Sequence, residues 1–374
     1  MPDNVFSHDS LRAILEAYPR CRLAHLPTPL QRLERLSARY DVNLLIKRDD
    51  ETGLAFGGNK ARKLDFLMAD VLEQGARSVI SWAGVQSNWC RQLAAACCHL
   101  GIRPVLLLFK RNGLPSELDG NLLLDLICDA DVHVVDLDCS RKMMEISGVS
   151  DLVLELADRE MRAGRKPYIA PIGASLTEGN MLRPLGAIAY VNAFQELLEQ
   201  AEAEKIHIDA VVFATGSGST HAGLVAGAQL LSPGTRIVGI SVSESRKDMA
   251  RITRPIVEQT FFEFGRGEKS ARPFDPNNLI IFDEYLGEGY GIPNVATIEA
   301  IRLVGKTEGI LLDPVYTGRA FVGLLDLIER GYFHPGENIV FLHTGGTPTI
   351  FPYREAFRKH LSLKESSTRL GPAA

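Results

Sequence analysis

The chain has 374 residues, of which 45% are hydrophobic and 23% charged, a balance typical of soluble globular proteins. Its net charge of −5 argues against nucleic acid as the main partner, because phosphate backbones are bound by basic surfaces. No apolar run reaches the roughly 18 residues of a membrane span, and the N-terminal segment lacks the features of a signal peptide.

A chain of this length favours two domains and can bury a sizeable core. Its six cysteines show neither paired metal-ligand spacing nor a Cys-x-x-Cys motif, and its histidines are scattered. We therefore expect a reduced, cytoplasmic protein that binds no metal, no membrane and no nucleic acid.

In chain order, residues 7–38 predict two helices separated by a proline-bounded connector. From residue 44 onward, short apolar runs alternate with helical segments, and this βαβ alternation predicts a mostly parallel sheet with helices on both faces. The predicted strands are 44–47, 79–83, 104–109, 132–137, 168–171, 210–214, 237–242, 279–282 and 339–342. The predicted helices include 92–100, 150–163, 185–203 and 296–307, and residues 364–374 are expected to form a loose tail.

The segment GGNKARKL, residues 57–64, places Lys60 at a predicted helix start. The glycines before Lys60 have no side chain that could obstruct a ligand. Helix N-termini carry partial positive charge, which makes a lysine there easier to deprotonate and a better nucleophile for Schiff-base formation. An ordinary surface lysine beside a glycine turn is the alternative.

A second segment, AVVFATGSGSTHAG at residues 210–223, predicts a strand followed by a glycine-rich turn into a helix. The backbone N–H groups of such a turn can close on an anion, and the helix dipole adds to the attraction. The turn also matches part of a dinucleotide-binding fingerprint, although that motif usually opens its fold and this one follows half of the chain. A small-residue helix packed on a sheet is a further alternative.

Two more pairs of polar residues are candidates for a binding or catalytic site. Ser87 and Asn88 lie between a predicted strand and a predicted helix, at another N-terminus able to bind an anion. A simple helix cap would explain the same residue types. Tyr290 and Tyr316 are phenols, which act as acid or base when their pKa is tuned and otherwise pack in a core.

The segments GGNKARKL (57–64), VQSNWCRQ (85–92) and DPVY (313–316) resemble those of one family. It is the group of pyridoxal-phosphate enzymes that contains D-cysteine desulfhydrase, 1-aminocyclopropane-1-carboxylate deaminase and L-cysteate sulfo-lyase. The resemblance covers nearly the whole chain. It implies an α/β fold of type II, with two open, mostly parallel twisted sheets and helices on both faces. It also implies a homodimer, and a small α/β domain (61–174) inserted in a larger cofactor domain (1–60 and 175–374).

The resemblance assigns roles to particular residues. Lys60 would hold pyridoxal phosphate covalently and remove the Cα proton, and Ser87 would receive the substrate carboxylate. The implied catalytic residues are Lys60, Ser87, Tyr290 and Tyr316, and the implied substrate-binding residues are Ser87, Asn88, Trp89, Tyr290 and Tyr316. The implied cofactor-binding residues are Lys60, Asn59, Asn88, Thr215, Gly216, Ser217, Gly218, Ser219, Thr220 and Thr344.

The chain departs from the family at three places. Trp89 stands where relatives often have His or Gln, so we expect its indole to reshape the substrate pocket. Thr317 replaces the Glu that faces the pyridine nitrogen in the deaminases, and Thr344 is the expected partner of that nitrogen. Residues 175–183 exceed the family's Gly-Ser turn and form either a surface bulge or a loop that contacts the far end of the substrate.

The resemblance predicts a lyase that performs α,β-elimination on a small β-substituted amino acid, with D-cysteine as the first substrate expected. A cyclopropane-opening deaminase and an L-cysteate sulfo-lyase are the alternatives within the family. Two alternatives come from other classes. One is an NAD-binding oxidoreductase built on residues 210–223, and the other is a non-catalytic protein that binds pyridoxal phosphate.

Overall fold

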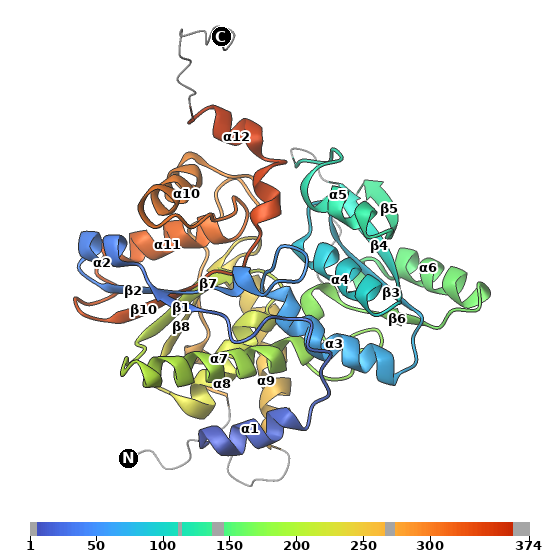
Figure 1. Ribbon diagram of the computed structural model, residues 1–374, viewed down its shortest axis with the longest axis horizontal. Coiled ribbons are helices and arrows are strands. Elements are labelled where there is room, and N and C mark those ends of the chain that lie inside the picture. The colour runs from blue at the N-terminus through green and yellow to red at the C-terminus, as the bar shows by residue number, and fades with distance from the viewer. Residues whose placement is uncertain (1–5, 111–113, 137–145, 266–273, 362–374) are drawn as a thin grey trace, which may run out of the picture.

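The computed structural model describes residues 6–110, 114–136, 146–265 and 274–361. Within them the chain forms two sheets, each covered by helices on both faces (Figure 1). Helix α3 (Lys60–Glu73) runs between the two sheets. Along the described residues, no helix is both long and apolar enough to cross a membrane.

The larger sheet has six strands in the order β1–β2–β10–β7–β8–β9. Every neighbouring pair is parallel except β1 with β2. The carboxyl ends of the parallel strands therefore lie at one edge, where α/β proteins bind their ligands. The bounds are β1 (Leu30–Arg32), β2 (Asn43–Lys47), β7 (Ala210–Thr215), β8 (Arg236–Ser241), β9 (Ile280–Phe282) and β10 (Asn338–Leu342).

The smaller sheet comes from the middle of the chain and has four parallel strands in the order β5–β4–β3–β6. The interior of β4 is a continuous apolar run that is buried on both faces, as expected for a parallel strand between two helix layers. The bounds are β3 (Ser78–Gly84), β4 (Arg103–Lys110), β5 (Asp131–Asp136) and β6 (Pro167–Ile169).

The helices other than α3 are distributed along the whole described chain. They are α1 (His8–Glu16), α2 (Glu34–Tyr40), α4 (Asn88–His99), α5 (Gly120–Ile127), α6 (Ser150–Arg162), α7 (Leu185–Ala203), α8 (Ser219–Leu231), α9 (Arg246–Gly265), α10 (Val295–Glu308), α11 (Thr317–Glu329) and α12 (Arg354–Arg358).

Alternation along the strands decides which helices cover each face. In β7, Val211 and Phe213 point to the layer of α7, α8 and α9, whereas Val212 and Ala214 point to the layer of α2, α10 and α11. On the smaller sheet, α3 and α4 cover one face and α6 covers the other. One apolar core runs from α4 and α3 through α7 and α8 to the larger sheet, so that the two sheets share it.

The predicted strands are all present, and the fold class is as expected. Two details differ, and two others lie outside the described residues. Strand β1 was not predicted, because its three residues carry no apolar pattern, and residue 137 of the predicted strand 132–137 lies outside the described residues. The helix expected at 92–100 begins four residues earlier, at Asn88, which moves Asn88 and Trp89 from a loop into a helix. The expected tail, 364–374, lies outside the described residues.

Candidate active site

Lys60 is the first residue of α3, and the turn before it packs closely on two other segments. A Cβ atom at Gly57 would lie 1.9 Å from the carbonyl oxygen of Asp50. A Cβ atom at Gly58 would lie 3.2 Å from the carbonyl oxygen of Thr344, in the segment after β10. Both glycines also have positive φ angles. Only glycine meets these two demands, and so the pair brings Lys60 to the carboxyl edge of the larger sheet.

The amine of Lys60 donates to Oδ1 of Asn59 at 2.8 Å and forms no ion pair with any described residue. Burial, followed by repulsion from the guanidinium of Arg91, lowers the pKa of Lys60 to about 8, while Asp313 opposes this shift. An appreciable fraction of the amine is therefore neutral, and thus nucleophilic, near neutral pH. The pKa of Lys60 is lowered as expected, but the cause differs. The sequence analysis attributed the shift to the helix N-terminus, whereas burial and Arg91 produce it in the structure.

Asn59 joins Lys60 to two other predicted cofactor segments. Its Nδ2 group donates to Oγ1 of Thr220 at 3.2 Å, and its backbone N–H donates to the carbonyl oxygen of Thr344 at 3.0 Å. Thr220 belongs to the glycine-rich turn after β7, and Thr344 follows β10. The structure thus brings together three segments that lie far apart in the sequence.

The glycine-rich turn leads directly into α8, whose N-cap is Gly218 with a φ of +90° and no side-chain cap. The first N–H groups of α8 therefore lack a capping side chain, as in anion sites at helix N-termini. The position of Gly216 is open, because an added Cβ would meet no atom closer than 3.6 Å. Ser217 places its Oγ against Gly173, while Oγ1 of Thr215 points at Sδ of Met249, 3.7 Å away, and so faces α9.

Lys63 is a buried lysine beside this turn that the sequence analysis did not single out. Its Nζ donates to Oγ of Ser219 at 2.9 Å and forms no ion pair with any described residue. Burial, with repulsion from Lys60 second, lowers the pKa of Lys63 well below its ordinary value. The spacing to Lys60 is i, i+3, which places both side chains on one side of α3 and could have revealed it.

Ser87 is the N-cap of α4, and its Oγ accepts from the N–H groups of Trp89 and Cys90, each at 3.2 Å. Asn88 accepts through Oδ1 from Arg91 at 3.0 Å and from Nδ2 of Asn121 at 2.9 Å. Its own Nδ2 group has no partner among the described residues and remains available as a donor. Both predicted residues thus lie beside the Lys60 turn, since Arg91 also donates to the carbonyl oxygen of Gly57 at 2.8 Å.

Trp89 departs from the expectation that its indole reshapes a substrate pocket. Its side chain is buried in the apolar core, and its Nε1–H donates to Oγ of Ser81 on β3 at 2.8 Å. The indole faces the smaller sheet, and the earlier start of α4 explains why. Trp89 then lies at i, i+4 and i+7 with Leu93 and Ala96, an apolar face that the sequence already contained.

The two predicted tyrosines lie in contact. Their hydroxyl oxygens are 2.6 Å apart, and the rings meet edge to face with centroids 6.0 Å apart. Burial, followed by the charge and hydrogen bond of Tyr290, raises the pKa of Tyr316 well above its ordinary value. The Tyr316 ring also borders the glycine-rich turn, because a Cβ added at Gly216 would lie 3.8 Å from its Cε1 atom.

Thr317 is the first residue of α11, and its hydroxyl is bound to Asp313. Its Oγ1 donates to Oδ1 of Asp313 at 2.7 Å and accepts from the Asp313 N–H at 2.8 Å. The same carboxylate accepts from the N–H groups of Val315, Tyr316 and Thr317, so that Asp313 holds the start of α11. The hydroxyl of Thr344 has no such partner among the described residues. Of the two threonines, Thr344 is therefore the one free to contact a ligand.

The family model for pyridoxal-phosphate-dependent enzymes matches residues 21–345. The D-cysteine desulfhydrases of Klebsiella pneumoniae (strain 342) and Salmonella typhi are each 38% identical to this chain, over 91% of it and 97% of each relative. The crystal structure of an ACC deaminase homologue is 36% identical, has a TM-score of 0.82, and is matched over 95% of this chain and 100% of its own. The chain belongs to the pyridoxal-phosphate-dependent enzymes.

The predicted family, fold class, enzyme class and cofactor are thereby confirmed. The Escherichia coli diaminopropionate ammonia lyase, at 15% identity and a TM-score of 0.62, shows the shared fold alone. The residues present fit the cofactor. The described residues include a half-buried lysine amine that forms no ion pair among them, an uncapped helix N-terminus for a phosphate, and a buried lysine beside that N-terminus. Among the described residues, no cluster of acidic, His or Cys side chains could hold a metal ion.

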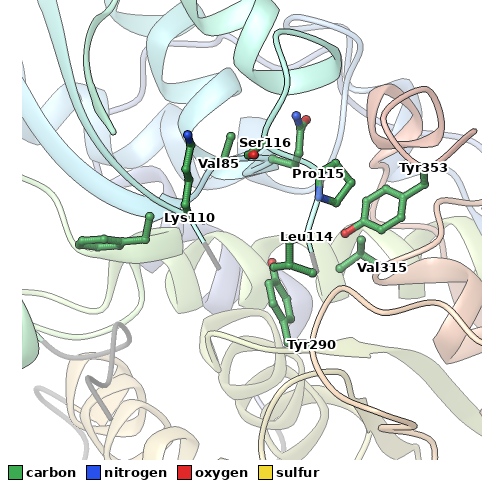
Figure 2. A pocket seen from close by; sticks show the side chains of 11 residues that line it. Val85, Lys110, Leu114, Pro115, Ser116, Tyr290, Val315 and Tyr353 are labelled. Carbon is green, nitrogen blue, oxygen red and sulfur yellow. The ribbon is translucent and has the colours of Figure 1, made fainter. Parts of the chain in front are cut away.

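A hollow of about 380 Å³, part of it open to solvent, adjoins the tyrosine pair of this enzyme (Figure 2). It lies between the end of the smaller sheet and the segments that carry Tyr290 and Val315. Figure 2 shows Tyr290 and Tyr353 on its one side and Lys110, at the end of β4, on the other. The lining residues are Gly84, Val85, Gln86, Phe109, Lys110, Leu114, Pro115, Ser116, Tyr290, Val315 and Tyr353.

The extra residues 175–183 pack against the edge of the smaller sheet and against α9. Oδ1 of Asn180 accepts from the N–H of Ile169 on β6 at 2.8 Å, and Oγ1 of Thr177 donates to Oε1 of Gln259 on α9 at 2.9 Å. The guanidinium of Arg183 lies 5.6 Å from the ring centre of Tyr18, near α1. Only the start of the segment touches the candidate site, where Oγ of Ser175 lies 3.2 Å from Oγ of Ser219. These contacts favour the surface bulge over a loop that reads the substrate.

Proposed function

We propose that this enzyme is a lyase that eliminates a leaving group from Cβ of a small amino acid, and that D-cysteine is its substrate. D-cysteine and water would yield pyruvate, hydrogen sulfide and ammonia. The observation that carries the proposal is the half-buried amine of Lys60, which forms no ion pair with any described residue, in a chain 38% identical to D-cysteine desulfhydrases. Pyridoxal phosphate supplies the electron sink that such chemistry needs.

The cofactor would be held by side chains and helix ends that already converge. Lys60 would provide the covalent link, and the N-terminus of α8 would bind the phosphate together with Ser219 and Thr220. Lys63 would supply a positive charge there, because an anion beside Ser219 favours the protonated amine over the neutral one. The free Nδ2 group of Asn88 would donate to the ring oxygen.

Proton transfers would fall to Lys60 and to the tyrosine pair. The neutral Nζ of Lys60 can accept the proton from Cα of the substrate. The phenol of Tyr316 stays protonated at neutral pH because burial raises its pKa. Tyr316 and Tyr290, 2.6 Å apart, can therefore pass a proton to the departing sulfur. The hollow beside them would admit the substrate side chain.

The two threonines favour elimination over opening of a cyclopropane ring. Thr317 is bound to Asp313, so Thr344 is the hydroxyl available to the pyridine nitrogen. A neutral hydroxyl stabilises a positive charge less than a carboxylate does. The site thus lacks the acidic partner that the deaminases have after their second tyrosine.

A substrate panel tests the proposal. The enzyme, loaded with cofactor, is given D- and L-cysteine, β-chloroalanine, cysteate, serine and 1-aminocyclopropane-1-carboxylate, and keto-acid release is measured. Pyruvate from D-cysteine at the highest kcat/KM is expected. Release of 2-oxobutyrate from the cyclopropane amino acid alone would replace the proposal with a deaminase.

Loading with cofactor is checked separately. Borohydride should bleach the visible absorbance and leave the label on Lys60, as peptide mass spectrometry would show. A colourless protein that binds NAD would instead support the alternative in which residues 210–223 bind a dinucleotide. A coloured protein inactive on the whole panel would point to a different substrate or to binding without catalysis.

We also propose, on the resemblance to the family, that the enzyme is a cytoplasmic homodimer with domains of residues 1–60 with 175–374 and of residues 61–174. The separate chain origins of the two sheets support that division. Light scattering of the purified protein tests the dimer, and limited proteolysis tests the boundaries.

A further inference from the structure

Arg91, in the first turn of α4, is a buried arginine to which the function proposed above gives no role. Its Nη2 group donates to the carbonyl oxygen of Gly57 at 2.8 Å. Its Nη1 group donates to Oδ1 of Asn88 at 3.0 Å and to Oδ1 of Asn121 at 2.8 Å. Nε has no hydrogen-bond partner among the described residues. All these acceptors are neutral, and Arg91 forms no ion pair within the described chain.

Hydrogen bonding alone does not explain why this position holds a charge. Burying a charge without a partner costs several kcal/mol. Gln92, the neutral next residue, already donates to the same carbonyl oxygen of Gly57. Burial lowers the pKa of Arg91 to about 10, with Asp125 and Asp313 opposing, so Arg91 stays charged at neutral pH.

The position of this charge is informative, because the Gly57 turn leads directly to Lys60. The charged groups that act on the Lys60 amine are Lys63 on α3, Arg91 on α4 and Asp313 before α11. Asp125, a buried carboxyl on α5, acts in turn on the guanidinium of Arg91. Asp313 accepts four hydrogen bonds from the start of α11, which already stabilise its carboxylate. Lys63 is itself easily deprotonated.

We propose that Arg91 is a positioning residue for Lys60, and that the buried Arg91 guanidinium raises the fraction of the Lys60 amine that is neutral. The guanidinium would do so by raising the energy of a second positive charge nearby, in surroundings that screen it little. This inference rests on the role proposed for Lys60, but its test needs no substrate.

The test separates charge from hydrogen bonding. Arg91→Gln removes the charge and keeps amide donors, whereas Arg91→Met removes both. Arg319→Met is the matched control, since Arg319 is also buried, donates to the carbonyl oxygens of Val242, Gly289 and Ile292, and has an unpartnered Nε. In the full-length chain stripped of cofactor, acetylation of Lys60 is followed by peptide mass spectrometry from pH 6 to 11, with exposed Lys359 as the reference.

In the unmodified chain the rate should reach half its maximum near pH 8. Both Arg91 variants should move this midpoint up by about one pH unit, which lowers the rate at pH 7.5 roughly eightfold. Arg319→Met should leave it in place. A midpoint unmoved in Arg91→Gln would overturn the proposal and leave Arg91 as a hydrogen-bond donor. An equal shift of the midpoint in Arg319→Met would also overturn the proposal, because it would show that loss of any buried arginine disturbs the packing around Lys60. If Arg91→Met does not fold, Arg91→Gln decides alone.

Discussion

The N-termini of α8 and α4 were both expected to bind an anion, yet the two differ in how their first N–H groups are capped. Gly218 at the start of α8 leaves the first N–H groups without a capping side chain. At α4, Oγ of Ser87 already accepts from two of these groups. Next to α8 lies the buried amine of Lys63, whereas the guanidinium of Arg91 in α4 is engaged by neutral acceptors.

The difference teaches what each helix can do for a ligand. An uncapped N-terminus beside a lysine favours a permanent, doubly charged anion such as the cofactor phosphate. A capped N-terminus must give up or share its cap when a carboxylate arrives, which suits a substrate that binds and leaves in every cycle. We therefore expect changes at α8 and α3 to alter cofactor affinity and changes at α4 to alter KM.

Lys60→Ala should have the largest effect. It removes the covalent link and the base together, so kcat should fall by at least about 10⁴-fold. Because the N-terminus of α8 and Lys63 are untouched, pyridoxal phosphate should still bind, reversibly and more weakly. Stopped-flow assays give kcat, and equilibrium dialysis gives the dissociation constant. Activity near that of the unmodified enzyme would remove Lys60 from the mechanism.

Lys63→Met sharpens the comparison on the α8 side. A charge-assisted hydrogen bond contributes about 1.5–3 kcal/mol, so cofactor affinity should fall about 10–100-fold while KM at saturating cofactor changes little. Lys359→Met, at an exposed lysine, is the control and should change neither quantity. Equal affinity in the Lys63 variant would mean that the helix N-terminus binds the phosphate without it.

Much of this site was predictable, because local patterns carry it. The glycine pair before Lys60 and the strand-turn-helix pattern around residues 215–220 can be recognised in the sequence. What sequence could not give were contacts between distant segments. Arg91 reads as an ordinary helix residue until the fold places it beneath the Gly57 turn. The direction of Trp89 depended on where α4 begins, which the pattern placed four residues late.

Ser87→Ala tests the α4 side. The loss of the cap should lower the free energy of unfolding by about 1 kcal/mol. If Ser87 also receives the substrate carboxylate, KM should rise about tenfold with little change in cofactor affinity. Ser7→Ala is the matched control, since Ser7 caps α1 through the N–H of Ser10 at 3.1 Å, at the N-terminal end of the chain in Figure 1. It should lower stability alone.

An unchanged KM in Ser87→Ala would mean that Ser87 only caps its helix and that the substrate carboxylate binds elsewhere. A fall in cofactor affinity as large as that of Lys63→Met would contradict the division of labour between α8 and α4. Urea denaturation of both serine variants, at the same cofactor concentration, supplies the stability values.

Trp89→Phe should have the smallest effect on catalysis, because the indole faces β3. Loss of the Nε1–H bond to Ser81 should lower the free energy of unfolding by about 1–2 kcal/mol, while KM changes less than about twofold. Ser81→Ala removes the other partner of that bond. A double-mutant cycle should therefore show coupling of about 0.5–1.5 kcal/mol between the two positions. A KM raised tenfold or more without such coupling would mean that the indole lines the substrate pocket. Substrate binding at the N-terminus of α4 would then depend on Trp89 as well as on Ser87.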